Sequence, residues 1–221
     1  MNKGIIFDFN GTLFFDEDKH IQAWQQISQE IRKKGITKQE LQTSINGVPN
    51  KQTIIYLLGY SPKEEEIIYW SLRKEEIYRS LCKQDIHNFK LVDGVIPYFN
   101  YLKSNNIPFT IASASIKENI DFFISSFHLD TWIKTEDIIY DNGSYTNKVN
   151  MFIDACKNLK LSTNEVVVFE DSVSGIQCAY EAGISNIVVI CNPEDKEKYS
   201  SLPGVIKIIK DYQDLDVLLN L

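Results

Sequence analysis

The sequence predicts an α/β fold, a doubly wound parallel sheet with a small α-helical domain inserted after its first strand. Short runs rich in β-branched residues are continuously apolar rather than alternating, as expected for strands covered on both faces. These runs span residues 3–9, 107–113, 165–171, 186–191 and 205–209. Helical patterns separate the later runs, and alternation of strand and helix is typical of a parallel sheet.

Three segments predict the helices that pack on this sheet. Residues 93–106 and 147–161 carry apolar residues at helical spacing, and each segment precedes an apolar run. Residues 174–184 follow the run at 165–171 with the same spacing, and Gly183 is placed to end the helix. The alternation therefore extends through the second half of the chain.

Residues 14 to about 87 break the alternation, because they contain amphipathic helical patterns with no convincing strand between them. These patterns lie at 20–35, 38–46, 50–59 and 62–85. No repeat or Pro-rich linker interrupts them, so the insertion should pack as a small bundle. We expect a core domain of residues 1–14 and 88–221 and a helical domain of residues 15–87.

The composition describes a globular chain and argues against several partners. The 221 residues, 43% of them hydrophobic, suffice for one buried core and a small accessory domain. A net charge of -7 and a pI near 5.1, without a basic cluster, argue against nucleic-acid binding. No apolar run approaches the roughly 18 residues that span a membrane. We expect a cytoplasmic monomer, since no long apolar helix face demands a partner.

The cysteines lack the CxxC spacing of metal and redox sites and lie in or beside apolar segments. They are Cys82, Cys156, Cys178 and Cys191. Buried free thiols are the simplest interpretation, and they suggest a reducing compartment.

Polar residues after the apolar runs form the candidate site, because the carboxyl ends of parallel strands meet at one edge of a sheet. Asp8 ends the first run, Gly11 permits a tight turn after it, and Thr12 adds a hydroxyl. Ser113 ends the second run, where its hydroxyl and successive backbone N–H groups, such as that of Ala114, suit a phosphate. Each of these residues taken alone is also compatible with a turn or a helix cap.

Charged residues complete the candidate site. Lys148 opens a predicted helix, where a cation is locally unfavourable, which indicates pairing with an anionic centre rather than a surface lysine. Glu170 and Asp171 follow the third run, where adjacent acids could also cap the next helix. Together with Asp8 they bring three carboxylates to one edge, and these would repel unless a cation lies among them. Hard oxygen ligands favour Mg²⁺.

Four segments, in this order and separation, resemble the haloacid dehalogenase-like (HAD) hydrolase superfamily, in its branch of helical-cap phosphatases and β-phosphoglucomutase-like enzymes. They are DFNGTLF, IASAS, TNKVNMF and VFEDSVSGIQCAYEAG, and the resemblance covers essentially the whole chain. The segment HIQAW, with His20, Ala23 and Trp24, is similar to an element that the branch commonly carries just after its first motif. The resemblance implies a Rossmann-like HAD core, a helical cap, and action on a small phosphorylated metabolite such as a sugar phosphate.

The resemblance also implies a role for each matched residue. Asp8 would attack phosphorus to give an aspartyl phosphate. Ser113 and Lys148 would hold the oxygens of the transferred group and neutralise developing charge, and cap closure would exclude water. Mg²⁺ would be held by Asp8, the backbone carbonyl of Asn10, Glu170 and Asp171.

Asn10 departs from the resemblance, because most phosphatases and mutases of the superfamily have aspartate two residues after the nucleophile. The backbone carbonyl is unaffected, but an amide side chain cannot shuttle a proton. General acid–base assistance is typically worth about 10²- to 10⁴-fold, so weak turnover of ordinary alkyl phosphates is predicted. A good leaving group, another acid, or a reaction that needs none would bypass the loss. An asparagine introduced to trap a phosphorylated state is a further explanation.

Three functions stay open on the sequence alone. A Mg²⁺-dependent phosphohydrolase ranks first. A sugar-phosphate mutase of the β-phosphoglucomutase type ranks lower, because the segment SINGVPNKQT offers no arginine for a second phosphate. The third is a catalytically weak metabolite-binding protein. His20 is a candidate for proton handling or substrate contact in the first two, or else a hinge residue.

Overall fold

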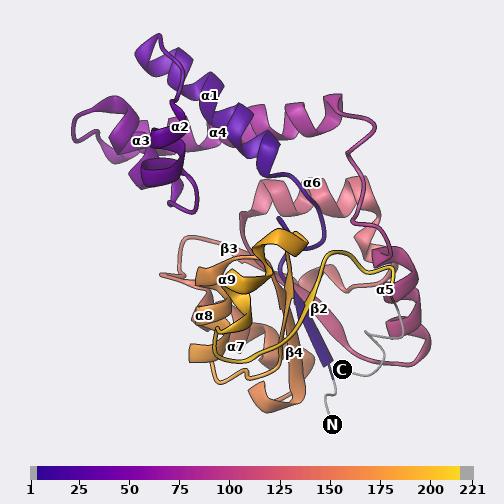
Figure 1. Ribbon diagram of the computed structural model, residues 1–221. Coiled ribbons are helices and arrows are strands. Elements are labelled where there is room, and N and C mark those ends of the chain that lie inside the picture. The colour runs from indigo at the N-terminus through magenta and orange to yellow at the C-terminus, as the bar shows by residue number, and fades with distance from the viewer. Residues whose placement is uncertain (1–3, 215–221) are drawn as a thin grey trace. The chain divides into compact units, whose positions relative to one another are not determined.

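The computed structural model describes residues 4–214 of the chain. The chain divides into two compact units, one of Met1–Phe15 with Lys90–Leu221 and one of Asp16–Phe89 (Figure 1). We call them the sheet unit and the helical unit. Among residues 4–214, no helix has the length and apolar character needed to cross a membrane.

The sheet unit is built on a six-stranded sheet with the order β3-β2-β1-β4-β5-β6, in which every paired strand is parallel. The strands are β1 (Gly4–Phe7), β2 (Phe109–Ile116), β3 (Ile139–Asp141), β4 (Val166–Glu170), β5 (Ile187–Ile190) and β6 (Val205–Ile209). The helices of this unit are α5 (Val95–Ser104), α6 (Lys117–Phe127), α7 (Lys148–Leu159), α8 (Val173–Glu181) and α9 (Lys196–Ser200). This arrangement confirms the predicted α/β fold class.

Both faces of the sheet are covered, which explains why the strand sequences are apolar without alternation. On one face Ile6 and Val168 pack with Phe152 of α7 and Ile176 of α8 in an aliphatic core. The other face is aromatic. There the Phe7 ring lies 5.3 Å from Phe99 of α5, 4.9 Å from Phe169 and 6.2 Å from Tyr212. Successive residues of β1 therefore serve opposite layers.

Several elements differ from the sequence-based expectation, among them α9, which was not predicted. Strand β2 continues to Ile116, so Ser113 lies within the strand instead of at its end. Strand β3 was not predicted because it has only three residues, all half-buried at the edge of the sheet. Helix α6 was not predicted either, although it buries Ile120 and Phe123 on one side.

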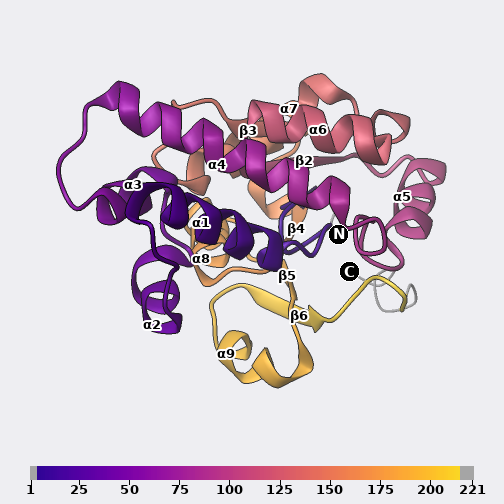
Figure 2. The same ribbon diagram turned by 90° about the horizontal axis from the view of Figure 1, so that it is seen from above.

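The helical unit contains helices and no strand in its described residues. Its elements are α1 (Glu17–Arg32), α2 (Lys38–Glu40), a π-helical turn (Leu41–Ile45), α3 (Asn50–Leu58) and α4 (Glu64–Gln84). Helices α1 and α4 lie side by side and α3 packs on α4 (Figure 2). Trp24, Ile27, Leu57 and Tyr78 are buried between them, so this unit has a core of its own.

Candidate active site

The candidate active site lies at the carboxyl ends of β1 and β4, beside Ser113 within β2. Asp8 follows β1 directly, and its backbone N–H donates to the Phe169 carbonyl of β4 at 2.9 Å. Glu170 is the last residue of β4 and Ser113 lies in β2, on the other side of β1. The sheet thus brings together side chains that are far apart in the sequence.

A tight turn follows Asp8 and fixes the next four residues. The Phe9 carbonyl accepts the N–H groups of Thr12, Leu13 and Phe14 at 3.2, 2.8 and 3.1 Å. Gly11 has φ +75°, a conformation that other residues adopt only with strain. This backbone then carries Thr12 to the edge of the site.

The Gly11 position also touches the third acid of the site. A Cβ atom at Gly11 would lie 2.3 Å from Asp171 Oδ2, so only glycine allows this approach. The Thr12 hydroxyl donates to Asp171 Oδ1 at 3.4 Å. Asp171 is therefore held against the turn that follows β1.

Lys148 links two of the carboxylates. It is the first residue of α7, because the Asn147 side chain caps that helix by accepting the Val149 N–H at 3.0 Å. The Lys148 ammonium lies 2.8 Å from Asp8 Oδ1 and also pairs with Glu170 Oε1. Burial alone would lower the pKa of Lys148, but these two carboxylates outweigh it and hold that pKa above its ordinary value. The lysine is thus a permanent cation beside Asp8.

Asp8 is buried, with 6% of its surface exposed. Burial raises the pKa of its carboxyl from 3.8 to about 6, opposed by the charge of Lys148 and reinforced by that of Glu170. The carboxyl is still ionised at neutral pH, as a nucleophile requires.

Glu170 is completely buried and is satisfied by the protein itself. Its Oε2 accepts the N–H groups of Asp171 and Ser172, both at 2.9 Å, and the Ser172 hydroxyl at 3.0 Å. A Cβ at Gly175 would lie 1.8 Å from Glu170 Oε1, so α8 can begin this close only with glycine there. Glu170 thus joins the end of β4, the start of α8 and Lys148.

Three carboxylates form a cluster that could hold a metal ion. Asp8, Glu170 and Asp171 each offer an oxygen, and these atoms lie within 4.8 Å of one another. Because Glu170 already accepts four hydrogen bonds, Asp8 and Asp171 are better suited to contact an ion directly.

Asn10 contacts two serines of β2. Its Oδ1 accepts the Ser115 hydroxyl at 2.7 Å and the Ser113 hydroxyl at 3.5 Å. The Ser115 N–H in turn donates to Ser113 Oγ at 3.2 Å. Ser115 was not among the predicted site residues, although the strand periodicity of two places it on the same face as Ser113. Ala114 lies between them and is exposed.

His20 lies on α1, in the helical unit. Its Nδ1 is 2.7 Å from the Lys74 ammonium, and its ring stacks on Tyr78 with centroids 4.1 Å apart. Since an ammonium can only donate, Nδ1 accepts, and Nε2 carries the proton 3.4 Å from Asp16 Oδ2. His20 therefore belongs to a network of charged residues within its own unit.

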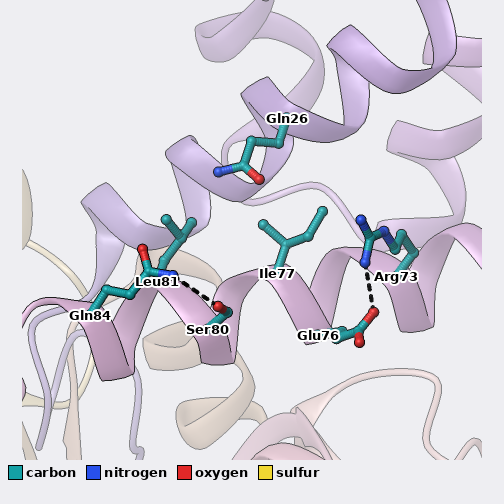
Figure 3. A pocket seen from close by; sticks show the side chains of 7 residues that line it. All are labelled: Gln26, Arg73, Glu76, Ile77, Ser80, Leu81 and Gln84. Atoms are coloured by element: carbon teal, nitrogen blue, oxygen red, sulfur yellow. Dashed lines mark hydrogen bonds and ion pairs between the residues drawn. The ribbon is translucent and has the colours of Figure 1, made fainter.

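A hollow of about 230 Å³ also opens on the helical unit, along α1 and α4 (Figure 3). Arg73 lines it and pairs with Glu76 at 2.8 Å. None of the residues predicted for the site lines this hollow.

The chain belongs to the haloacid dehalogenase-like hydrolase family, whose pattern matches residues 5–189. A crystal structure of a HAD hydrolase, family IA, variant 3, from Entamoeba histolytica is 34% identical. It superimposes with a TM-score of 0.89 and covers 97% of this chain and 95% of its own. The predicted family and the predicted class of enzyme, a HAD-like hydrolase, are confirmed.

Two relatives with named activities are phosphatases. The phosphorylated carbohydrates phosphatase of Thermotoga maritima is 22% identical over 98% of both chains. The chloroplastic 5-amino-6-(5-phospho-D-ribitylamino)uracil phosphatase of Arabidopsis thaliana is 27% identical over 84% of this chain and 49% of its own. The chain thus spans about half the length of that plant relative.

Proposed function

We propose that the protein is a Mg²⁺-dependent phosphohydrolase of a small phosphorylated metabolite, such as a sugar phosphate or an acyl phosphate. The observation that carries the proposal is the buried Asp8, with Lys148 at 2.8 Å and two further carboxylates within reach. The family and the named phosphatases among the relatives support the same activity.

In the proposed reaction, the Asp8 carboxylate attacks phosphorus while the bond to the leaving oxygen breaks, which leaves an aspartyl phosphate. Lys148 neutralises charge on the transferred oxygens, and the Ser113 hydroxyl donates to one of them. Water then cleaves the acyl phosphate and restores Asp8. Asp8, Asp171, Glu170 and the Asn10 backbone carbonyl would hold Mg²⁺, which supplies further neutralisation of phosphate charge.

The Asn10 side chain sets the choice of substrate within this proposal. It contributes no proton, so an alkoxide would leave unprotonated and slowly. Substrates with weakly basic leaving groups, such as acyl phosphates, need no such proton and should be preferred. His20 could replace the missing acid only as an imidazolium, since the neutral ring that accepts from Lys74 is far too weak an acid.

The test is phosphate release with Mg²⁺ from a panel of monoesters, acyl phosphates and pyrophosphates. The unmodified protein is compared with Asp8→Ala, Asn10→Asp and the surface control Asp121→Ala. We expect Asp8→Ala to abolish turnover and Asp121→Ala to leave it intact.

Two results would contradict the proposal. Ligand-dependent thermal stabilisation without product from any variant would indicate a binding protein. Turnover that requires a sugar bisphosphate as primer would indicate a mutase.

A further inference from the structure

We propose that Asn10–Gly11 is a self-modification site, at which the Asn10 amide is hydrolysed to the carboxylate of aspartate. The converted chains would then carry most of the turnover. The second statement rests on the proposed function, whereas the first concerns the chemistry of the turn alone.

Gly11 is the structural reason for the site. The φ of +75° at Gly11 and the close approach of the Asp171 carboxylate both favour glycine directly after Asn10. The backbone nitrogen of a glycine also reaches the side chain of a preceding asparagine with the least steric hindrance, because glycine has no Cβ to block ring closure. The glycine that follows Asn10 thus leaves the Asn10 side-chain amide open to attack by the Gly11 backbone nitrogen.

The side-chain carbonyl of Asn10 is polarised by two serine hydroxyls. The Ser115 hydroxyl donates to Oδ1 at 2.7 Å, with the Ser113 hydroxyl at 3.5 Å. Donors aimed at a carbonyl oxygen stabilise the negative charge that develops there when a nucleophile adds to the carbon. Asn10 and Gly11 are half-buried rather than enclosed, so water reaches the product of that addition.

The proposed step is balanced by water alone. The Gly11 nitrogen loses its proton and bonds to Asn10 Cγ, and ammonia leaves with the Asn10 nitrogen to give a cyclic imide. Water then opens the imide at one of its two carbonyls, giving aspartate or isoaspartate. No oxidant or reductant is required.

One hydrogen bond opposes closure and sets the rate. The Gly11 N–H donates to the Phe14 carbonyl at 2.8 Å and must leave it before the nitrogen can attack. Conversion therefore proceeds from a locally opened turn, and it should be slow compared with catalysis.

Slow conversion is sufficient to dominate activity. General acid–base assistance is worth about 10²- to 10⁴-fold, so conversion of about 1% of the chains to aspartate would about double total turnover even at the lower end of that range. Isoaspartate adds a backbone methylene and should not contribute. The phosphatase activity of a preparation would then increase with the time for which the protein has been stored.

The chain supplies its own reference sites, because Asn46–Gly47 and Asn142–Gly143 repeat the dipeptide in exposed turns. The Ser144 hydroxyl donates to Asn142 Oδ1 at 2.6 Å, as Ser115 does to Asn10. The protein is incubated at mildly alkaline pH, and peptide mass mapping follows the amide at all three sites. Ser115→Ala should slow conversion only at Asn10, and the matched Ser144→Ala only at Asn142.

Phosphate release is measured in parallel on charge-separated fractions, since each converted chain gains one negative charge. We expect turnover to rise in proportion to aspartate at position 10 and not with conversion at Asn142. Asn10→Gln, whose longer side chain disfavours ring closure, should show no rise with incubation.

The outcomes separate the two statements. If Asn10 stays an amide while Asn46 and Asn142 convert, or if Ser115→Ala does not slow it, the modification site is wrong. If fractions that carry aspartate at position 10 are no more active than amide-only fractions, the converted chains do not carry turnover. If Asn10→Asp is inactive on the whole panel, the proposed function fails, whatever the mass at position 10.

Discussion

Two buried carboxylates, Asp8 in the sheet unit and Glu75 in the helical unit, have pKa values displaced in opposite directions. Burial raises the pKa of Asp8 to about 6, and the charge of Lys148 only partly offsets it. Burial also acts to raise the pKa of Glu75, but the charge and hydrogen bond of Lys74, with a hydrogen bond from Asn50, outweigh it and lower the value to about 2. The two residues should therefore give opposite dependences of stability on pH.

The prediction for Asp8 concerns the range between pH 4 and 6. Its carboxyl binds a proton more tightly in the folded chain, so this group's contribution to stability falls as pH rises from 3.8 to about 6. The difference in free energy of unfolding between the unmodified protein and Asp8→Asn should fall by up to about 3 kcal/mol over that range. Denaturant titrations in chelator measure it, and a flat difference would contradict the shift.

The prediction for Glu75 has the opposite sign. Its stabilisation is complete above pH 4.5 and is lost as pH falls towards about 2. Glu75→Gln should therefore lower the free energy of unfolding by about 3 kcal/mol at pH 7, with a smaller effect in acid. Glu76→Gln, on the exposed side of α4, is the matched control and should have little effect. Equal effects of the two variants would refute the role of burial.

Lys148 provides a third residue-scale prediction. Lys148→Met leaves Asp8 and Glu170 buried without their shared cation, which typically costs about 3–5 kcal/mol of stability. It should also abolish phosphate release. Lys157→Met, on the same helix but with a 70% exposed side chain, should change neither property. Retention of activity by Lys148→Met would show that this lysine has no part in the reaction.

Most of the candidate site could be predicted from residue types after apolar runs. Asp8, Lys148, Glu170 and Asp171 lie together because parallel strands share one carboxyl edge. Ser115 could not be found in this way, because it lies beyond the point where the apolar run stops although the strand continues. The strand continues there because Ile116 pairs with Asp141 of β3, a contact that no local pattern reveals.

At the scale of elements, the junction of β4 and α8 contradicts the local rule for glycine. In an ordinary helix, Gly→Ala is stabilising by roughly 0.5–1 kcal/mol. Gly175→Ala would instead place a Cβ 1.8 Å from Glu170 Oε1 and should be strongly destabilising. Ser174→Ala, one residue earlier and exposed, should stay within about 0.5 kcal/mol of the unmodified protein. Thermal unfolding of both variants tests this prediction. A Gly175→Ala variant that is more stable than the unmodified protein would show that helix propensity outweighs the contact with Glu170.

The sequence predicts long periodic elements better than short ones. Helices α1, α4 and α7 were expected within a few residues of their observed ends, because each buries one continuous face. Strand β3 has no such face, since it has only three residues, all half-buried at the edge of the sheet. Hydrophobic periodicity detects elements that bury one continuous face, so it does not detect a short edge strand such as β3.

At the scale of the whole molecule, the helical unit has the features of an independent folding unit. It buries its own core, and its first and last helices are joined where Lys19 of α1 lies 2.6 Å from Asp85, directly after α4. A fragment of residues 16–89 should therefore be helical by circular dichroism and melt cooperatively. Lys19→Met should lower the melting temperature of the fragment. Lys51→Met removes the exposed ion pair of Lys51 with Glu64 and should not lower it. A fragment without helical signal would show that the unit depends on the sheet.

The Lys19–Asp85 contact also bears on the order in which the chain folds. Strand β1 pairs with β2, whose partner residues lie roughly a hundred positions later, so the central pairing must close a long loop. If the helical unit forms first, its joined ends shorten that loop to roughly a third, which saves about 1 kcal/mol of closure entropy. The inserted helices would then speed the search by which the first strand, made earliest on the ribosome, finds the neighbours made after it.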